Sequence, residues 1–266
     1  MAGVGRATSD ARCKVCRKLM LSIPEHDGRA IGATTAIQRG DVDALQRLLC
    51  EDPNLAAARV VDGRGVSRTL LHIVADWPGH FPNGPRTVSM LVAAGADINA
   101  HVQQPAGPHP SNETAWHWAA SSDDVAVIDA LLDGGAGIEA PGAVFTGGTP
   151  MSDAVVFAQW RAARRLLERG ATTTIWQAAA LGLADRVRAF WAVEPTPTVE
   201  AITNAIWHAC RGGQEPPAEY LLERGADMNW LGHDGKTPCD VAQDANAAHM
   251  VRWLRERGAK RAAELK

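Results

Sequence analysis

The chain of 266 residues contains no stretch of about 18 consecutive apolar residues, the length that a membrane-spanning helix requires. It also lacks an excess of basic residues, since 27 Lys and Arg stand against 30 Asp and Glu and give a net charge of −3. Proteins that bind nucleic acid carry a basic patch, so neither a membrane nor a nucleic acid is expected as a partner. The N-terminus has no apolar segment before a small-residue cleavage site, which predicts a cytoplasmic protein.

Motifs of nucleotide-dependent, hydrolytic and metal-dependent enzymes are absent as well. No nucleophile elbow, P-loop, dinucleotide fingerprint or metal triad occurs. Cys13 and Cys16 form a C-x-x-C, but a tetrahedral zinc site needs four ligands and no second pair lies nearby. We therefore predict no metal and no cofactor. The other three cysteines occupy apolar positions that predict buried free thiols: Cys50, Cys210 and Cys239.

What the sequence does contain is a segment that returns several times. It reads GADIN at residues 95–99, GAGIE at residues 135–139 and GADMN at residues 225–229, with shortened copies beginning at Gly170 and Gly258. Each copy follows a Leu-rich apolar run, and the successive copies begin 40, 35, 55 and 33 residues apart. Self-similarity at a period of about 20–50 residues indicates a solenoid of stacked units.

A second motif lies between these copies. Residues 69–75 and 114–120 have the spacing T-P-L-H-x-A, and residues 149–154 and 237–242 are degraded versions of it. With both motifs in fixed register over residues 33–260, the chain resembles the ankyrin-repeat family, whose unit of about 33 residues is a turn followed by two helices. The resemblance implies that His72 and His117 are structural residues that bind neighbouring backbone turns.

The resemblance implies an all-α fold, an ankyrin-repeat solenoid of about seven helix–turn–helix units with short β-hairpin fingers. We expect residues 1–28 to be a flexible leader, residues 29–260 to be the ankyrin-repeat domain and residues 261–266 to be a C-terminal tail. The fifth unit lacks its Gly-Ala exit and ends at residues 195–197 (Pro-Thr-Pro), where we expect the stack to bend. Units two to four carry enlarged loops, at residues 78–85, 101–112 and 141–148.

Tryptophan is unusually frequent, with nine Trp against one Tyr and four Phe. Five of them are predicted to pack between units: Trp160, Trp176, Trp191, Trp207 and Trp253. Of these, Trp176 and Trp207 are predicted to occupy the position that His holds in the other units.

The family typically recognises proteins through a concave surface, made by the hairpin tips and by the late positions of the first helices. We therefore predict a binding module for a protein partner, because exposed aromatic and Arg side chains dominate interface energetics. The predicted binding residues are Asp76, Trp77, His80, Trp118, Phe157, Arg211, His233, Asp234 and Lys236.

An alternative is a binding protein for a small apolar molecule, or a cofactor-independent enzyme of the lyase, isomerase or cyclase type. In this interpretation the enlarged loops wall an apolar pocket over units three and four, and His and Asp side chains transfer protons. Its candidate catalytic residues are Asp76, His80, His233 and Asp234. Long loops cost little free energy, so loops without any function are an equally open explanation. The absence of any enzyme motif favours the binding module over the enzyme.

Overall fold

The protein is represented by a computed structural model, which describes residues 21–105 and 112–265. Within these residues the chain forms fourteen α-helices, three short β-strands and four 3-10 turns. The first eight helices are α1 (Gly28–Arg39), α2 (Val42–Glu51), α3 (Leu70–Ala75), α4 (Gly84–Ala93), α5 (Ala115–Ser121), α6 (Val125–Asp133), α7 (Pro150–Val156) and α8 (Trp160–Glu168). They are followed by α9 (Ile175–Ala180), α10 (Ala184–Ala189), α11 (Val199–Arg211), α12 (Glu215–Leu222), α13 (Pro238–Asp244) and α14 (Ala248–Glu256).

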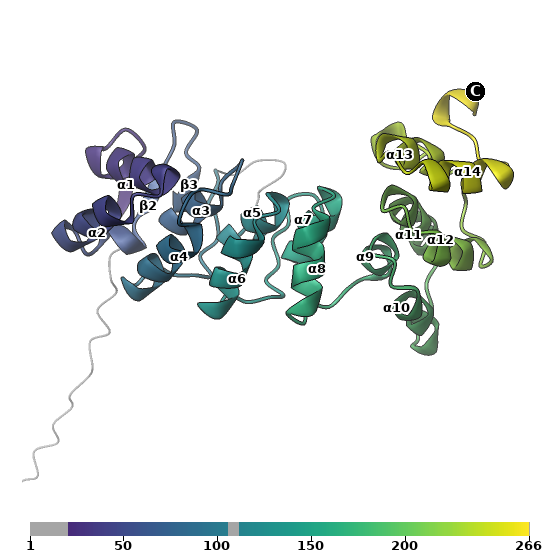
Figure 1. Ribbon diagram of the computed structural model, residues 1–266, viewed down its shortest axis with the longest axis horizontal. Helices are drawn as coiled ribbons and strands as arrows, with labels where there is room; N and C mark the ends of the chain where they lie inside the picture. Colours follow the sequence, from purple (N-terminus) through teal and green to yellow (C-terminus); the bar gives the residue numbers. More distant parts are fainter. Residues whose placement is uncertain (1–20, 106–111, 266) are drawn as a thin grey trace, which may run out of the picture.

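Consecutive helices pack as pairs, and each pair contacts its neighbours along the chain. The first helices of successive pairs form one layer, in which α1, α3, α5 and α7 contact in turn, as do α9, α11 and α13. The second helices α2, α4, α6 and α8 form the other layer (Figure 1). Because each pair buries its apolar side chains against the next, the architecture is a stack without a single globular centre. It is compatible with an ankyrin-like all-α fold.

Apart from α1, which is capped by Asp27, the first helices begin at threonine caps, which explains why the T-x-x-H motif recurs. Thr69 donates its backbone N–H to His72 Nδ1 (3.3 Å), and His72 Nε2 lies 3.2 Å from the carbonyl oxygen of Glu113 in the next unit. His117 repeats this arrangement with Thr114 (3.1 Å) and the carbonyl of Gly148 (3.3 Å). Nδ1 accepts, so the proton is on Nε2 and donates across the repeat boundary. The predicted structural role of both histidines is confirmed.

One predicted position is wrong by a residue. Gln177, and not Trp176, takes the place of His in the fifth pair: its Oε1 accepts from the Thr174 backbone N–H at 2.8 Å, and its Nε2 donates to Ser152 Oγ at 3.0 Å. In the sixth pair α11 starts earlier, with Thr198 as its cap, so Trp207 lies in the middle of a longer helix.

The predicted leader (residues 1–28) and the predicted tail (residues 261–266) both contain residues that belong to the fold. Strand β1 (Ser22–Pro24) runs parallel to β2 (Arg59–Val61), which is antiparallel to β3 (Ser67–Thr69), in the order β1-β2-β3. The folded region therefore starts before residue 28. At the other end, the Ala262 backbone N–H donates to Asp240 Oδ2 at 2.9 Å, so the predicted tail is held against α13. Cys13 and Cys16 lie outside the described residues.

The cysteine prediction holds in two of three cases. Cys210 and Cys239 are buried free thiols in α11 and α13. Cys50 is exposed, because it lies on the outer side of α2, where Gln46 Nε2 donates to its Sγ at 3.4 Å.

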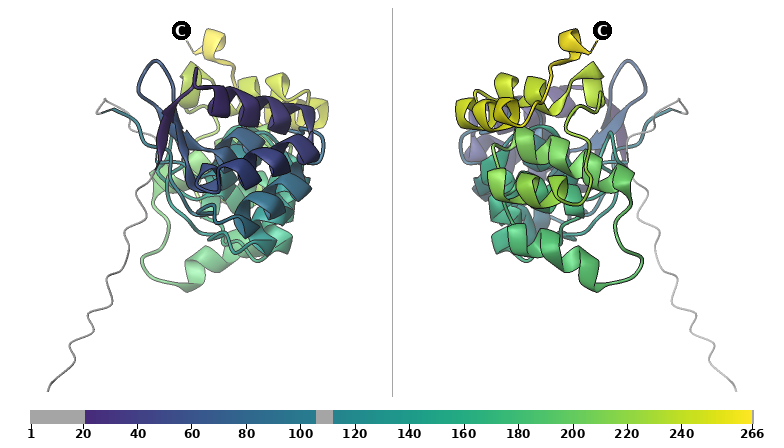
Figure 2. Two further views of the ribbon diagram at one scale, coloured as in Figure 1. Left: turned by 90° about the vertical axis from the view of Figure 1, so that its left-hand side faces the viewer. Right: turned by 90° about the vertical axis from the view of Figure 1, so that its right-hand side faces the viewer.

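The stack changes direction between α8 and α9. Figure 1 shows α1–α8 in a row along the long axis, whereas α9–α14 are stacked across it; Figure 2 looks along that axis, so that the α1–α8 row is seen end on. The buried apolar residues form two clusters, one from Ile23 to Ala180 and one from Ile175 to Ala259, and Trp176 packs against both. The bend expected at residues 195–197 is thus in the wrong place, because α9 and α11 on either side of that loop pack extensively.

Candidate functional site

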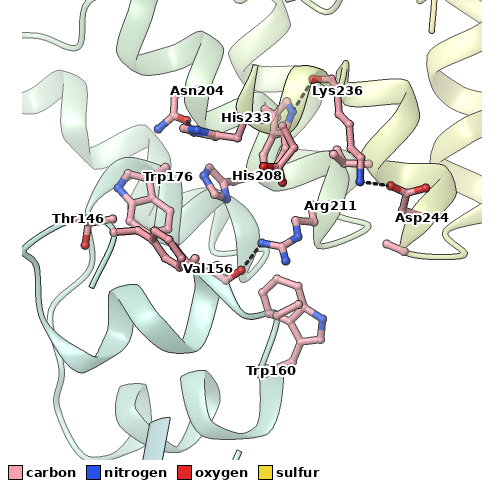
Figure 3. A pocket seen from close by; sticks show the side chains of 16 residues that line it. Thr146, Val156, Trp160, Trp176, Asn204, His208, Arg211, His233, Lys236 and Asp244 are labelled. Atoms are coloured by element: carbon pink, nitrogen blue, oxygen red, sulfur yellow. Dashed lines mark hydrogen bonds and ion pairs between the residues drawn. The ribbon is translucent and has the colours of Figure 1, made fainter. Parts of the chain in front are cut away.

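A cavity of about 710 Å³ opens where the two groups of helices meet. Val156 at the end of α7 and Trp160 of α8 line one side, and Trp176 of α9, with His208 and Arg211 of α11, lines the other (Figure 3). The finger before α13 and the end of α13 itself close a third side. The sparse contact between α7 and α9 leaves this space, since side chains cannot fill a bend as they fill a regular stack.

Arg211 crosses the bend. Its Nη1 donates to the carbonyl oxygens of Val156 (2.6 Å) and Val155 (3.3 Å) at the C-terminal end of α7, and the Val155 carbonyl also accepts from the backbone N–H of Ala158 (3.1 Å). The side chain is half-buried, and this burial lowers the pKa of its guanidinium, while Asp234 raises it. No ion pair joins Arg211 to a carboxylate among the residues that the structure describes. A positive charge therefore sits in the wall of the cavity without an acidic partner in contact.

His208 lies next to Arg211 and is 5% exposed. Its ring is 4.6 Å from that of Trp176 and 4.9 Å from that of Trp207, measured between centroids. Burial lowers the pKa of His208 to about 3, with smaller effects of His233 and Arg211 in the same direction, so the imidazole is neutral at physiological pH. Its buried Nδ1 has no hydrogen-bond partner in the described part of the chain.

The finger before α13 supplies a polar edge. His233 Nε2 lies 3.0 Å from Asn204 Oδ1, and the His233 ring meets Trp207 edge to face at 5.2 Å. Lys236 binds Asp244 of α13 through an ion pair of 2.9 Å. Asp234 is exposed at the tip with φ 56°, a left-handed conformation that Asp tolerates better than most residues.

Two phenylalanines stand beside the cavity. Phe145, in the finger before α7, lines it and is 70% exposed. Phe157, directly after α7, is 41% exposed and lies 5.8 Å from Phe145 between ring centroids. Large apolar side chains are costly to leave in water, so this pair is a candidate contact surface.

The structure brings together four of the nine predicted binding residues. Arg211, His233, Asp234 and Lys236 all line the cavity, and Phe157 adjoins it through Phe145. The remaining four lie in the N-terminal group of helices, away from this cavity.

Three of those four are engaged within the chain. Asp76 pairs with Arg68 at 3.2 Å, and burial raises the pKa of its carboxyl against the opposing effect of Arg68. The His80 backbone N–H donates to Asp124 Oδ2 at 2.7 Å, and His80 Nε2 lies 3.0 Å from the Ser122 carbonyl. The indole N–H of Trp118 donates to Glu113 Oε2 at 3.2 Å. Trp77, by contrast, is 82% exposed.

The alternative catalytic group is therefore divided between two places. Asp76 and His80 belong to the turns around α3 and α5, whereas His233 and Asp234 belong to the finger before α13. The enlarged loop at residues 78–85 packs against neighbouring turns, where Asn83 Nδ2 donates to the Gly40 carbonyl at 2.8 Å. Among the described residues of the three enlarged loops, those that line the cavity belong to the third loop, Phe145 and Thr146.

The predicted site residues do not include His208, whose imidazole is buried in the wall of the cavity. Arg211 follows His208 by three residues and Trp207 by four, which places its side chain beside both of theirs on the helix surface. That spacing is the signal in the sequence for a shared wall. The spacing could not show that residues of α7 and α8 lie across the cavity from this wall, because their position depends on the bend.

Two comparisons bear on the chain. The family model for the ankyrin repeat matches residues 111–143, a segment that contains His117 and the GAGIE motif. No curated protein shows a significant match. The chain thus contains an ankyrin repeat, and ankyrin repeats are generally protein-interaction modules.

The part of the chain that the structure describes contains neither a membrane-spanning helix nor a group of metal ligands. None of its helices is both long and apolar enough to span a membrane. No three His, Cys, Asp or Glu side chains in residues 21–105 and 112–265 group closely enough to hold a metal ion.

Proposed function

We propose that the protein is an interaction module that binds a protein partner. The partner contacts the surface formed by the C-terminal ends of the first helices, with the Phe145–Phe157 pair as the central contact. The observation that carries this proposal is the exposure of aromatic side chains at equivalent places of different helix pairs. Trp77 follows α3 and Phe157 follows α7, and these helices stack through α5. Equivalent positions of stacked units share one face, so both rings belong to the same side of the stack.

The energetic argument is that exposed Trp and Phe bring large contact areas to an interface. Trp is strongly enriched among the residues whose truncation costs about 2 kcal/mol or more of binding free energy. Arg211, His233 and Lys236 lie beside Phe145 and would form the polar rim of such an interface. In this proposal Asp76, His80 and Trp118 act through the packing of the stack and contact the partner only at the margin.

We further propose that each helix pair is one ankyrin unit, which gives seven units between α1 and α14. This register is supported by threonine N-caps, since each of them precedes the first helix of a pair: Thr69, Thr114, Thr174 and Thr237.

The test compares Phe157→Ala with Val193→Ala. Val193 is 68% exposed and lies in the loop after α10, so both substitutions remove a solvent-exposed apolar side chain. Partners retained from lysate by the immobilised wild-type chain are quantified by mass spectrometry. We expect Phe157→Ala to reduce retention of the same partner about tenfold or more and Val193→Ala to leave it unchanged.

Thermal unfolding of both variants controls for folding, and little change is expected because both side chains are exposed. Equal retention by wild type and Phe157→Ala, or an equal loss with Val193→Ala, would show that Phe157 does not contact the partner.

A further inference from the structure

We propose that the cavity at the bend is a binding site for an aromatic ligand that carries a carboxylate. The carboxylate contacts the guanidinium of Arg211, and the ring lies against the indole groups of Trp176 and Trp160. This inference does not rest on the proposed protein partner, because it concerns a cavity and not the outer Phe157 surface.

The first argument is the geometry of Arg211. Its Nη1 is held by the carbonyl oxygens of Val155 and Val156, which fixes the plane of the guanidinium. Its Nε and Nη2 donate to no acceptor among the described residues, and together they form the side-on fork that matches the two oxygens of a carboxylate. A guanidinium with one edge anchored and one edge free is oriented before the ligand arrives, which lowers the entropy cost of binding.

The second argument is the balance of charge. Lys236 and Asp244 neutralise each other through their ion pair at the edge of the cavity. Asp234 is exposed at the tip of its finger, where water and salt screen its charge. Arg211 is half-buried, so its field is screened least and dominates inside the cavity. An anion is therefore favoured over a cation.

The third argument is the shape and polarity of the walls. Trp160 and Trp176 are only partly buried and expose ring surface to the cavity from α8 and α9. Figure 3 shows His208 between Trp176 and Arg211. The buried Nδ1 of this neutral imidazole is a polar atom for which the described residues supply no hydrogen-bond partner. Such an atom in a cavity wall is explained when a bound ligand completes the hydrogen bonding around it.

The volume fits this class of ligand. A cavity of about 710 Å³ is within the range of about 300–1,000 Å³ that is typical of small-molecule sites. The same chemistry occurs in two sources: a free aromatic acid, or a polypeptide that ends in an aromatic residue with its terminal carboxylate.

The test is calorimetric titration of the purified full chain with phenylacetate, indole-3-acetate and 1-naphthoate, each compared with its own amide. The amide keeps the ring and removes the charge. We expect at least one acid to bind saturably and about tenfold or more tightly than its amide, since hydrogen bonds to charged groups are roughly twice as strong as neutral ones. Absence of saturable binding by all three acids, or equal affinities for acids and amides, would overturn the proposal.

Arg211→Gln isolates the carboxylate contact. A change in the bend would weaken acid and amide alike, whereas loss of the contact removes only the difference between them. We expect the preference for the acid to disappear in Arg211→Gln and to persist in Arg224→Gln, whose guanidinium instead stacks on Tyr220. Retention of the full preference in Arg211→Gln would also overturn the proposal.

The two sources are separated with the tripeptides Gly-Gly-Phe and Gly-Gly-Trp, each with a free and with an amidated C-terminus. Tighter binding of the free peptides than of the small acids identifies a polypeptide terminus as the ligand, and exclusion of the peptides identifies a free acid. Because only the purified chain is used, failure here leaves the Phe157 experiment unaffected, and the reverse also holds.

Discussion

At the scale of single residues, three of the first helices, α3, α5 and α9, are each joined to a neighbouring pair by one polar side chain of variable chemistry. His72, His117 and Gln177 each bind the threonine cap of their own helix and a polar group of a neighbouring pair. Asp240 binds Thr237 and the C-terminal segment in the same way. The same arrangement is thus formed by different functional groups. Each position requires one acceptor for the backbone N–H of the threonine cap and one polar contact with a neighbouring segment.

The two histidines make the fold sensitive to acid. Burial lowers the pKa of His72 to about 3 and of His117 to about 4, against 6.5 for the ordinary side chain. The unfolded chain therefore binds more protons than the folded chain below about pH 6.5, and stability is lost as the pH falls from there toward the folded values.

Asp153 has the opposite effect. It is 1% exposed, its Oδ2 has no partner in the described part of the chain, and burial together with Glu113 raises the pKa of its carboxyl to about 8. Between about pH 4 and pH 8 the folded chain holds a proton that the unfolded chain has released. Its contribution to stability therefore falls as the pH rises through this range.

We predict that Asp153→Asn stabilises the protein by about 2 kcal/mol at pH 8 and leaves stability nearly unchanged at pH 4, since asparagine needs no proton on folding whereas Asp153 must take one up as the pH rises. Urea unfolding at both pH values measures this difference. Asp185→Asn, at an exposed position paired with Arg188, is the control and should show no such dependence on pH. An effect of Asp153→Asn that is equal at pH 4 and pH 8 would contradict the assignment.

At the scale of elements, the turn between the paired helices relies on close backbone approach. Gly40 ends α1 with φ 66°, and its amide N–H donates to the carbonyls of Ala36 and Ile37. A Cβ at this position would collide with the Pro82 carbonyl oxygen of the enlarged loop before α4. The loop at residues 78–85 thus packs against the turn of the preceding unit.

We predict that Gly40→Ala destabilises the protein by about 2–4 kcal/mol, since it combines the strain of a left-handed alanine with a backbone clash. Gly170→Ala is the matched control, because Gly170 has φ 96° and open space around its Cβ position. The control should cost only the strain, about 1 kcal/mol. Thermal unfolding measures both, and equal losses would show that the Pro82 contact does not constrain Gly40.

At the scale of the whole molecule, two short stacks are joined at one weak boundary. Trp176 packs against both apolar clusters, and two polar side chains reach α7 from the C-terminal stack: Arg211 from α11 and Gln177 from α9. The bend creates the cavity, and the Phe145–Phe157 pair lies beside it. The candidate ligand site and the candidate partner surface are therefore neighbours.

We predict that Arg211→Met loosens this boundary. Loss of the two hydrogen bonds to α7 should cost about 1–2 kcal/mol and change the small-angle X-ray scattering profile toward a wider range of shapes. Arg224→Met, within the C-terminal stack, should leave the profile unchanged because its contacts with Tyr220 and Trp191 lie inside one cluster. An unaltered profile for Arg211→Met would mean that the remaining contacts, the packing of Trp176 and the Gln177–Ser152 hydrogen bond, set the bend without Arg211.

Much of the architecture could be predicted from residues alone. The recurrence of T-x-x-H and of Gly-Ala after Leu-rich runs determined the all-α stack and the structural role of His72 and His117, because these are local requirements of caps and helix ends. The same reasoning failed at Trp176 and Cys50, where the direction of a side chain depends on helix register and on neighbours.

The site was decided by the tertiary structure. Arg211, His233, Asp234 and Lys236 were chosen from the sequence for their type and their place in the units, and they do line one cavity. They lie beside Trp160, Trp176 and Val156 because the stack changes direction between α8 and α9. At this place the contact between neighbouring first helices, α7 and α9, is sparse. Sequence periodicity specifies local turns and helices, whereas the angle between units is set by packing over many side chains at once, and no short motif encodes it.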